Sequence, residues 1–575
     1  MSADEVWWRT AVVYQVYPRS FADSDGDGVG DLAGLESRLD HLATLGVDVL
    51  WLSPVYPSPQ DDNGYDISDY RDIDPVFGSL ADFDRLLAAV HVRGMRLVMD
   101  LVVNHTSDEH PWFVESRSRV DSPKRDWYWW RPPRPGMAAG APGAEPTNWV
   151  AAFSGSAWEL DEASGEYFLH LFSRRQPDLN WENPEVRQAV YAMMRWWLDR
   201  GVDGFRMDVI NLVSKDPALP DGPVHGSAPY GDGSRSYVCG PRIHEFLQEM
   251  HREVFAGRDA ALLTVGEMPG VTVDEARLFT DPARAEVDMV FQFEHVQLDQ
   301  GASKWDLRPF RLRDLKTSFN RWQVGLADVG WNSLYWNNHD QPRIVSRWGD
   351  DGEHRVAAAK LLGTVLHLHR GTPYVYQGEE LGMTNFPFAA IEDFADIESV
   401  NHYRSAVAAG EEPAEVLAAL RAKSRDNART PMQWDASPAA GFTTGTPWLA
   451  VNPNSVEVNA AAQAGDPDSV FSHYRRLIDL RHTEPVVADG DFAMLLPEHE
   501  TVYAFTRSYE GVSLLVLGNF APAPAAVEVP AQWAGAPVLL GNLPDPAGVG
   551  PGGAVTLRPW EARVLRRTEP PDAPG

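Results

Sequence analysis

The stretch Gly-Phe-Arg-Met-Asp at 204–208 is a short, largely apolar run that ends in a carboxylate. Two further segments have the same form, Leu-Leu-Thr-Val-Gly-Glu at 262–267 and Leu-Tyr-Trp-Asn-Asn-His-Asp at 334–340. An ionised carboxylate is costly in apolar surroundings unless it is paired or has a task. We therefore expect the acids that close these segments to lie at strand ends and to converge in one pocket.

These segments belong to a series of strand-like runs along the chain. Amphipathic stretches separate most of the runs, for example Leu35–Leu45 and the apolar stripe from Ile243 to Val254. Buried parallel strands that alternate with helices are typical of a closed α/β sheet. The sequence therefore predicts a (β/α)8 TIM barrel, whose active site lies at the carboxyl ends of the strands. The predicted strands are Val12–Tyr17, Val47–Leu52, Arg96–Val103, Val202–Met207, Leu262–Val265, Met289–Phe293, Leu334–Asn337 and Pro373–Tyr376.

Two internal segments and the C-terminal part depart from this repeat. Residues 105–176, after the third strand, are rich in Trp, Pro and Gly and are predicted to form an inserted lobe. Residues 384–453 are predicted to form a mixed helical insertion after the eighth strand. The barrel itself is expected to comprise residues 1–104 and 177–488. Short alternating runs near the end of the chain predict a C-terminal antiparallel β-sandwich domain over 489–575.

The composition restricts the class of partner. The chain has 575 residues and a formal net charge of −32, which argues against nucleic acid or an anionic membrane as a partner. It fits an enzyme that acts on a neutral solute as a monomer or small homo-oligomer. The single cysteine, Cys239, excludes an intramolecular disulfide. The sequence shows no secretory signal region and no apolar stretch long enough to cross a bilayer, so a cytoplasmic location is expected.

Asp208 and Glu267 have the positions that glycoside cleavage needs. In a retaining enzyme one carboxylate attacks the anomeric carbon, a second carboxyl group protonates the leaving oxygen, and the two lie ~5 Å apart. Adjacent strands lie ~4.8 Å apart, so the ends of the fourth and fifth strands can provide that separation. Arg206, two residues before Asp208, faces the same side of the strand and would keep Asp208 ionised. Glu267 must hold a proton, so burial or the charge of Asp208 should raise its pKa.

The acidic segments, together with Asp-Leu-Val-Val-Asn-His at 100–105, resemble the signature regions of the alpha-amylase family of glycoside hydrolases (family thirteen). The resemblance runs in the expected order from about Val6 to beyond Tyr503. Taken alone, the histidines in these segments would be interpreted as structural. The resemblance implies that Asp208 is the nucleophile, that Glu267 is the acid/base, that Asp340 stabilises the distorted sugar, and that His105, Arg206 and His339 contact the sugar or the nucleophile.

Further segments resemble the oligo-1,6-glucosidase and alpha-glucosidase branch of that family. They are Asp-Asp-Asn-Gly-Tyr-Asp at 61–66, Gln-Pro-Asp-Leu-Asn-Trp at 176–181 and Asn-Ala-Arg-Thr-Pro-Met-Gln-Trp at 427–434. The branch has a closed pocket for one terminal glucose, which implies exo-action. A surface salt bridge of little consequence is the alternative role for Arg429. By resemblance, Asp62 and Arg429 would bind the hydroxyls of the terminal glucose, Tyr65 would stack on its ring, and Phe172 and Gln176 would line the same pocket.

Val209, which follows the expected nucleophile directly, bears on the linkage. In this branch a valine at that position is associated with α-1,6-acting enzymes and a smaller residue with α-1,4 preference. The sequence therefore predicts a retaining exo-α-glucosidase that releases glucose from short α-1,6-linked isomalto-oligosaccharides. The alternatives are an α-1,4-glucosidase and a glucosyl-transferring isomerase of the trehalose or isomaltulose synthase type on the same scaffold.

Two other classes of protein share this scaffold. A sugar-phosphate hydrolase would need a cationic cluster near the pocket, and none is evident in the sequence. A non-catalytic protein of this fold, such as a transporter heavy chain, would have lost an acid and gained a membrane span. This chain has all three acids and no span, which argues against the non-catalytic class.

Asp-Ser-Asp-Gly-Asp-Gly-Val-Gly-Asp at 23–31 is a separate acidic loop. Its oxygen atoms at positions 1, 3, 5, 7 and 9 match a calcium loop, with Gly28 at the turn. Position 12 is Gly34 rather than a bidentate Glu, so the loop is not an EF-hand. It resembles the structural metal loop of the same branch, which implies a structural Ca²⁺ or Mg²⁺ and no organic cofactor; an acidic surface turn without an ion is the alternative. The candidate ligands are the side chains of Asp23, Asp25, Asp27 and Asp31 and the carbonyl oxygen of Val29.

Overall fold

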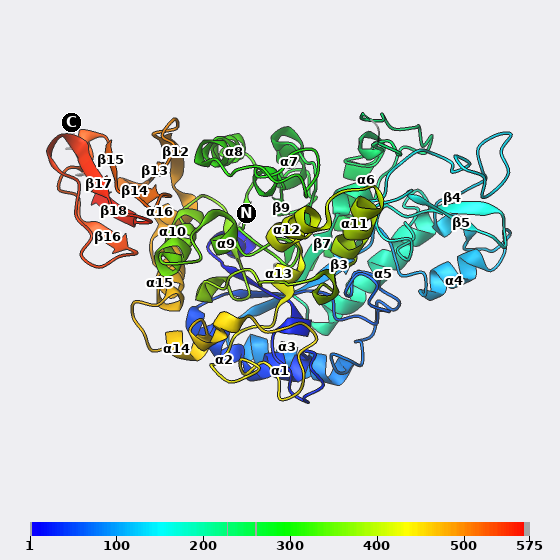
Figure 1. Ribbon diagram of the computed structural model, residues 1–575, viewed down its shortest axis with the longest axis horizontal. Helices are drawn as coiled ribbons and strands as arrows, with labels where there is room; N and C mark the ends of the chain where they lie inside the picture. Colours follow the sequence, from blue (N-terminus) through cyan, green and yellow to red (C-terminus); the bar gives the residue numbers. More distant parts are fainter. Residues whose placement is uncertain (1–2, 227, 259–261, 569–575) are drawn as a thin grey trace.

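The computed structural model describes residues 3–226, 228–258 and 262–568. Its centre is a barrel of eight parallel strands within these residues, in the order β10-β11-β1-β2-β3-β7-β8-β9 (Figure 1). A parallel bridge between Val290 and Asn332 joins the two outer strands and closes the sheet. The predicted barrel is therefore confirmed. Its strands are β1 (Val13–Val16), β2 (Val49–Leu52), β3 (Arg96–Val102), β7 (Gly204–Asp208), β8 (Leu263–Glu267), β9 (Met289–Phe291), β10 (Ser333–Leu334) and β11 (Thr372–Tyr376).

Alternate side chains of these strands enter two different cores. In β2, Val49 and Trp51 belong to the cluster that fills the barrel, with Met289 and Phe291 from β9. Leu50, between them in sequence, belongs to the larger core under the helices. This alternation follows from the two-residue period of a strand. Because both faces of the barrel are buried, most strand residues are apolar, and charged ones such as Asp100 and Arg206 are paired with each other.

The helices that surround the barrel differ in two places from the expected pattern. The stretch predicted as one helix from Leu35 to Leu45 is two helices, because Arg38 leaves helical geometry (φ −109°, ψ 4°). The stripe from Ile243 to Val254 ends as an α-helix at Met250 and continues as a π-turn over His251–Phe255. The surrounding helices are α1 (Leu32–Ser37), α2 (Leu39–Leu45), α3 (Leu80–Val92), α5 (Pro184–Arg200), α6 (Ile243–Met250), α7 (Val273–Thr280), α8 (Leu312–Gly325), α9 (Ile344–Trp348), α10 (Arg355–His367), α15 (Val470–Thr483) and α16 (Pro485–Asp489).

The segment after β3 forms a lobe beside the mouth of the barrel. Bridges from His105 to Asp178 and from Tyr128 to Leu179 tie its outgoing and returning ends together. The antiparallel sheet of the lobe has the order β4-β6-β5 and lies at one end of the molecule in Figure 1. Its elements are α4 (Pro111–Arg117), β4 (Trp130–Arg131), β5 (Trp158–Asp161) and β6 (Glu166–Leu169).

The segment after β11 is mainly helical. It comprises α11 (Ile397–Ala408), α12 (Pro413–Lys423), α13 (Asp426–Arg429) and α14 (Ala460–Gln463). Asn401 of α11 donates a hydrogen bond to the carbonyl oxygen of Phe153 in the lobe, at 3.4 Å. The lobe and the helical insertion therefore meet beside the barrel mouth, although they are far apart in sequence.

The C-terminal part is antiparallel, as predicted, and lies at the end of the molecule opposite the lobe (Figure 1). Its larger sheet has the order β12-β13-β14-β18-β16, and β15 pairs with β17 in a second small sheet. Residues 569–575 of the expected domain lie outside the described residues. No helix in the described part of the chain has the length and apolar character that a membrane crossing requires. The strands are β12 (Asp491–Leu495), β13 (Val502–Tyr509), β14 (Val512–Asn519), β15 (Ala525–Glu528), β16 (Val538–Gly541), β17 (Ala554–Leu557) and β18 (Ala562–Thr568).

Candidate active site

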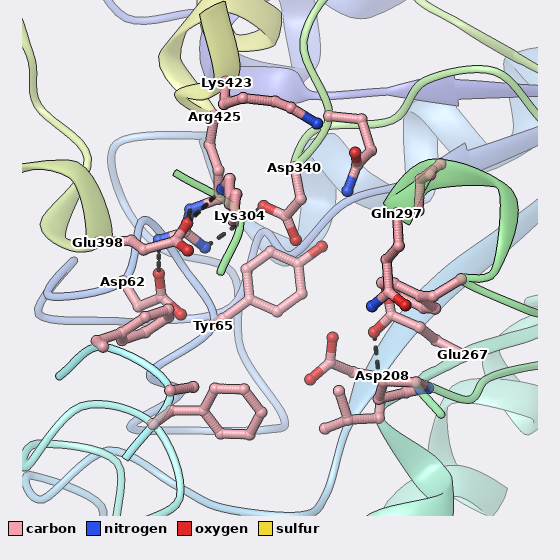
Figure 2. A pocket seen from close by; sticks show the side chains of 18 of the residues that line it. Asp62, Tyr65, Asp208, Glu267, Gln297, Lys304, Asp340, Glu398, Lys423 and Arg425 are labelled. Carbon is pink, nitrogen blue, oxygen red and sulfur yellow. Dashed lines mark hydrogen bonds and ion pairs between the residues drawn. The ribbon is translucent and has the colours of Figure 1, made fainter. Parts of the chain in front are cut away.

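A cavity of about 290 Å³ lies at the carboxyl ends of the barrel strands. The lobe contributes aromatic walls to it and the helical insertion contributes charged residues. Figure 2 shows the expected nucleophile and acid on one wall and Asp62 on the opposite wall, with Tyr65 between them. The predicted site residues that line the cavity are Asp62, Tyr65, His105, Phe172, Asp208, Val209, Glu267 and Asp340.

Arg206 binds the carboxylates at the base of the cavity. Its side chain is fully buried, and Nη1 lies 2.7 Å from Oδ1 of Asp208 and 2.6 Å from Oδ1 of Asp100. Nη2 forms an ion pair with Glu267, whose other oxygen accepts a hydrogen bond from the amide of Val209 at 3.2 Å. The ends of β7 and β8 thus bring Asp208 and Glu267 to one guanidinium group, as adjacent strands allow.

The protonation of this cluster differs from the expectation in one respect. Burial raises the pKa of Asp208; Arg206 opposes this rise, and Glu267 and Asp100 add to it, so the net direction is upward. Burial also raises the pKa of Glu267, again against the effect of Arg206. One guanidinium therefore offsets only part of the rise in pKa that burial causes in these two acids. Each of them holds a proton more readily than an exposed carboxyl group does.

Asp340 lies beyond the end of β10 rather than at it. Its Oδ1 is 2.8 Å from Nη2 of Arg429 and 3.4 Å from Nη1 of Arg425, and its Oδ2 is 3.3 Å from Nε2 of His339. Burial would raise the pKa of Asp340, but His339 and the cations around it hold that pKa well below its usual range. Asp340 is therefore ionised, whereas the pKa values of Asp208 and Glu267 at the base of the cavity are raised.

Of the two predicted histidines, His105 lines the cavity and His339 does not, and both rings are neutral. His339 stacks on Tyr65 with ring centroids 4.9 Å apart and an angle of 6° between the planes. Burial lowers the pKa of His339 to about 3 and that of His105 to about 4. Gln176 is buried and does not line the cavity, but it holds the loop that does, because its Nε2 donates to Oδ2 of Asp62 at 3.1 Å and to the carbonyl oxygen of Tyr65 at 3.2 Å.

Arg429 does not contact Asp62. It is fully buried behind Asp340, so the alternative of a surface salt bridge is wrong. The guanidinium beside Asp62 is that of Arg425, with Nη2 at 2.9 Å from Oδ1 of the acid. Arg425 lies four residues before Arg429, a spacing that places two residues on one helical face. The spacing alone would not have identified Arg425 as the partner of Asp62, because that contact depends on the fold.

The aromatic wall closes the cavity on the side of the lobe. Phe172 packs against His105 and Phe153, with ring centroids 5.2 and 5.8 Å apart. The guanidinium of Arg425 lies 4.9 Å from the centre of the Phe153 ring. The inserted lobe and the helical insertion therefore meet over the cavity and restrict access to it.

Several lining residues have no signal in the local sequence. The cavity is also lined by Lys304, Lys423 and Arg425, so the expectation of no cationic cluster near the pocket is wrong. Each cation is paired, Lys304 with Glu398 at 2.5 Å and Lys423 with Asp299 at 2.5 Å. The partners in each pair are far apart in sequence, by 94 positions for Lys304 and Glu398 and by 124 positions for Lys423 and Asp299. Only the fold brings them together.

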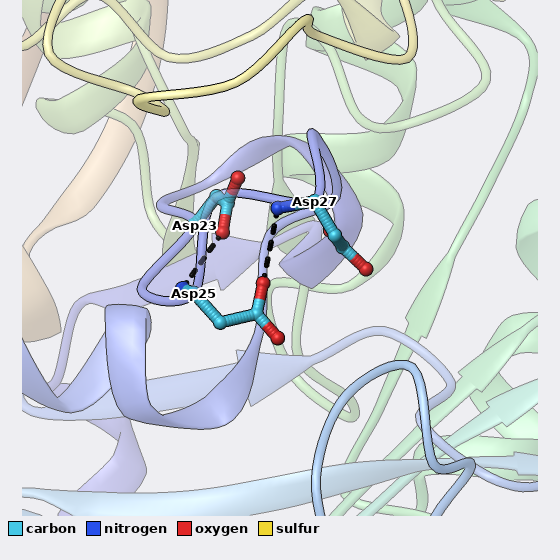
Figure 3. A group of neighbouring side chains, drawn as sticks. All are labelled: Asp23, Asp25 and Asp27. Atoms are coloured by element: carbon cyan, nitrogen blue, oxygen red, sulfur yellow. Dashed lines mark hydrogen bonds between the residues drawn. The ribbon is translucent and has the colours of Figure 1, made fainter.

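The loop at 23–31 brings a set of carboxylates together away from the active-site cavity. Ligand oxygens of Asp23, Asp25 and Asp27 all lie within 4.8 Å of one another (Figure 3). Burial would raise the pKa of Asp23, but hydrogen bonds from Thr443 and from the loop amides lower it. Gly28 has φ of +95°, and a Cβ there would lie 1.9 Å from the carbonyl oxygen of Thr446. This cluster of oxygen donors fits a hard divalent cation.

The side chain of Asp31 and the backbone amide of Val29, which is the other predicted ligand residue, make hydrogen bonds within the loop. Asp31 caps α1, where its Oδ1 accepts from the amide of Gly34 at 2.7 Å and its Oδ2 from the amide of Ser24 at 2.7 Å. The amide of Val29 donates to Oδ1 of Asp27 at 2.7 Å. The carboxylate of Asp31 therefore fixes the base of the loop, and the three converging acids are the residues that could hold an ion.

The chain matches the family described as "Alpha amylase, catalytic domain" over residues 15–490. It is 56% identical to an oligo-1,6-glucosidase of Parageobacillus thermoglucosidasius, over 98% of this chain and 99% of that protein. Among solved structures, it is similar to a trehalose-6-phosphate hydrolase of Bacillus licheniformis (TM-score 0.91, 46% identity, 98% of this chain and 100% of that one). It is also similar to a trehalulose synthase of Pseudomonas mesoacidophila MX-45 (TM-score 0.92, 44% identity, 97% and 99%). The chain therefore belongs to the alpha-amylase family of glycoside hydrolases.

Proposed function

We propose that the protein is a retaining exo-α-glucosidase that releases terminal glucose from short α-1,6-linked isomalto-oligosaccharides. The observation that carries this proposal is the arrangement of Asp208 and Glu267 at the ends of neighbouring strands, both paired with Arg206 at the base of one cavity. A pair in which Asp208 is charged and Glu267 is protonated would supply a nucleophile and an acid at the same time. The oligo-1,6-glucosidase relative supports the choice of linkage.

The reaction has two steps. Asp208 attacks the anomeric carbon and forms a glucosyl ester, while Glu267 gives its proton to the departing glycosidic oxygen. Glu267 then takes a proton from water, and the water oxygen attacks the same carbon, which frees Asp208 and releases α-glucose. Asp340 remains charged throughout and can accept hydrogen bonds from the sugar hydroxyls as the ring distorts.

The shape of the cavity supports exo-action on short chains. Phe153, Phe172 and Arg425 close the side of the cavity next to the lobe. Asp62 and Arg425 are buried polar groups at the same end, which suits the hydroxyls of one terminal glucose. A substrate without matching hydroxyls would leave these buried groups without hydrogen bonds, which costs binding free energy. Such groups therefore discriminate strongly between substrates.

The test is a comparison of initial rates on isomaltose, isomaltotriose, maltose, sucrose and trehalose. We expect isomaltose to react faster than maltose in the unmodified protein. Asp208→Ala should abolish turnover, and Glu267→Gln should lower kcat by about 10²–10⁴-fold, both without loss of Tm. Glu411→Gln, a change at an exposed acid of the helical insertion, is the matched control. Near-normal activity of Asp208→Ala would refute the assignment.

Glucosyl transfer on the same scaffold is the alternative, supported by the likeness to the trehalulose synthase. Transfer and hydrolysis share the ester intermediate and differ only in whether a sugar or water takes the glucose. Incubation with sucrose separates them, because a transferase gives a rearranged disaccharide and a hydrolase gives free glucose and fructose.

A sugar-phosphate substrate is a further candidate, because Lys304 and Lys423 line the cavity and one similar structure is a trehalose-6-phosphate hydrolase. Against it stands the pairing of each lysine with an acid at 2.5 Å, which leaves little free positive charge for a phosphate. If the protein hydrolysed trehalose-6-phosphate faster than isomaltose, the sugar phosphate would be the preferred substrate and the proposed function would be wrong.

We also propose that the loop at 23–31 holds a structural Ca²⁺, with Mg²⁺ as the alternative ion. Asp23, Asp25 and Asp27 would bind it, because their oxygens converge and carboxylates are preferred ligands of both ions. The ion would stabilise the loop and take no part in the reaction. The single cysteine and the acidic charge support a cytoplasmic enzyme, as a monomer or small homo-oligomer.

A further inference from the structure

We propose that a surface groove along α8 binds the acceptor-side glucosyl units of longer isomalto-oligosaccharides, an inference that rests on the proposed function. The groove, called here the α8 groove, is a cavity of about 800 Å³ beside α7 and α8. Residues from both helices and from the loop after β9 line it. Those used in the argument are Phe293, Gln297, Thr317, Asn320 and Val324.

The α8 groove adjoins the catalytic cavity. Phe293 and Gln297 line both. Figure 2 shows Gln297 beside Glu267, on the wall opposite Asp62. If Asp62 marks the end that holds the terminal glucose, the part of the substrate released by Glu267 leaves on the side of Gln297. The α8 groove therefore begins where a longer substrate would emerge.

The depression continues along one face of α8 to the C-terminal domain. A further cavity of about 770 Å³ shares Thr317 and Asn320 with the α8 groove and reaches Met494 in β12. Thr317, Asn320 and Val324 are spaced by three and four residues, so they lie on one face of the helix. Figure 1 shows α8 between α7 and β12, and this path gives a flexible chain a surface beyond the catalytic cavity.

The chemistry of the lining suits a neutral sugar chain. The side-chain amides of Gln297 and Asn320 have no hydrogen-bond partner among the described residues. Each amide offers two donors and an acceptor, which match sugar hydroxyls. Val324 is 58% exposed and presents an apolar surface on which the C–H face of a sugar ring can pack.

The charges along this path argue against an anionic ligand. In the α8 groove, Glu294 is paired with Arg321 at 3.0 Å, and Asp274 adds a negative charge. In the second cavity the basic and acidic side chains are equal in number, three of each, so their formal charges cancel. They are Arg311, Arg313, Lys316, Asp314, Glu498 and Glu500.

The experiment measures kcat/KM for isomaltose, isomaltotriose, isomaltotetraose and isomaltohexaose in the unmodified protein and in Asn320→Ala. The readout is the ratio of the isomaltohexaose value to the isomaltose value. We expect Asn320→Ala to lower this ratio about two- to tenfold, the change that one lost hydrogen bond gives. Leu278→Ala, at an exposed residue of α7 that lines none of these cavities, should leave the ratio unchanged.

A ratio that is the same in Asn320→Ala and the unmodified protein overturns the inference while the proposed function stands. Failure of the unmodified protein to release glucose from isomaltose refutes the proposed function instead. A binding measurement is a second test. In an Asp208→Ala background, calorimetry should show tighter binding of isomaltohexaose than of isomaltose, and Asn320→Ala should reduce this difference. Equal affinities for the two sugars would contradict the groove.

Discussion

At the scale of single residues, Arg206 organises the site. It is fully buried and contacts Asp100, Asp208 and Glu267. Asp100 in turn accepts a hydrogen bond from the hydroxyl of Tyr65 at 2.9 Å. The arginine therefore links the catalytic acids to the ring that is expected to face the sugar. A lysine could not replace it, because only the planar guanidinium can contact several carboxylates in one plane.

Val209 is the residue at which the linkage can be tested. Its backbone is left-handed (φ 36°, ψ 39°), which is rare for a β-branched residue and costs about 1–3 kcal/mol. Its side chain lines the cavity beside Asp208. We expect Val209→Ala to lower the ratio of kcat/KM for isomaltose to that for maltose, by about 10–200-fold if the side chain sets the linkage.

The matched control for this change is Val92→Ala, on the exposed surface of α3, which should keep the original ratio. Rates on both disaccharides are measured for each variant under the same conditions. If Val209→Ala alters both rates equally, the side chain has no role in the choice of linkage.

At the scale of elements, loops and turns connect parts that are distant in sequence. The acidic loop at 23–31 contacts the segment at 443–448, where Thr443 donates to Asp23 and the amide of Trp448 donates to the carbonyl oxygen of Gly28 at 3.0 Å. An ion in this loop would therefore stabilise the attachment of the helical insertion to the barrel as well as the loop itself.

Removal of divalent ions should lower Tm. A ligand at 100 times its Kd stabilises a fold by about 2.7 kcal/mol, and a chelator would remove that contribution. We expect EDTA to lower Tm and added Ca²⁺ to restore it more effectively than Mg²⁺, with kcat at 25 °C unchanged. Asp25→Asn combined with Asp27→Asn should make Tm independent of EDTA. Asp328→Asn, at an exposed acid of another loop, is the control and should respond to EDTA as the unmodified protein does. If EDTA leaves the Tm of the unmodified protein unchanged, the proposal of a bound ion is wrong.

Glu379 joins elements around the end of β11 and gives the fold a pH dependence. It is fully buried, and it accepts hydrogen bonds from Asn337 at 2.7 Å and from Tyr474 of α15 at 3.0 Å. Burial raises the pKa of Glu379 to about 8, from an ordinary value of 4.5. The folded state thus keeps a proton that the unfolded state has lost at neutral pH.

The sign of the effect follows from these two pKa values. The contribution of Glu379 to stability is complete below pH 4.5 and is lost as the pH rises through about 8, at no more than about 1.4 kcal/mol per pH unit. Glu379→Gln is neutral at every pH, so its Tm should fall less between pH 5 and 8 than that of the unmodified protein. Thermal melts across this range check the prediction, with Glu411→Gln as the control. If Tm falls with pH equally in Glu379→Gln and the unmodified protein, Glu379 is not the cause of the pH dependence.

At the scale of the whole molecule, buried arginine side chains join the barrel to the C-terminal domain. Arg507 of β13 is fully buried and donates to carbonyl oxygens of Leu368, Val487 and Gly490 at 2.7, 2.8 and 2.6 Å. These acceptors lie after α10, in α16 and before β12. Burial lowers the pKa of Arg507 to about 9, so the arginine is still charged at neutral pH.

Arg507→Ala should destabilise the protein by about 2–4 kcal/mol, because carbonyl groups that it satisfied would be left buried without partners. Calorimetry should show a lower Tm, while activity at low temperature is retained because the active site lies elsewhere in the barrel. Arg475→Ala, at an exposed arginine of α15, is the control. An unchanged Tm for Arg507→Ala would mean that the two parts are held together by apolar packing alone.

The sequence by itself determined the barrel and the residues that form the base of the site. Apolar runs that end in acids located β7 and β8, and the two-residue period of a strand placed Arg206 on the same side as Asp208. Such information is local, because burial of both faces of a strand requires a run of apolar residues. Asp340 was found in the same way, as an acid that closes a run, whereas His105 and His339 were predicted only from the resemblance to the alpha-amylase family.

The tertiary structure decided what distant segments contribute. Arg425, rather than Arg429, lies beside Asp62, and Lys304 meets Glu398 at the cavity, because the helical insertion folds back over the barrel mouth. The balance of charge around Asp208 also depends on burial and on Asp100 from another strand. These properties arise from distances between residues far apart in the chain, and no local pattern in the sequence encodes such distances.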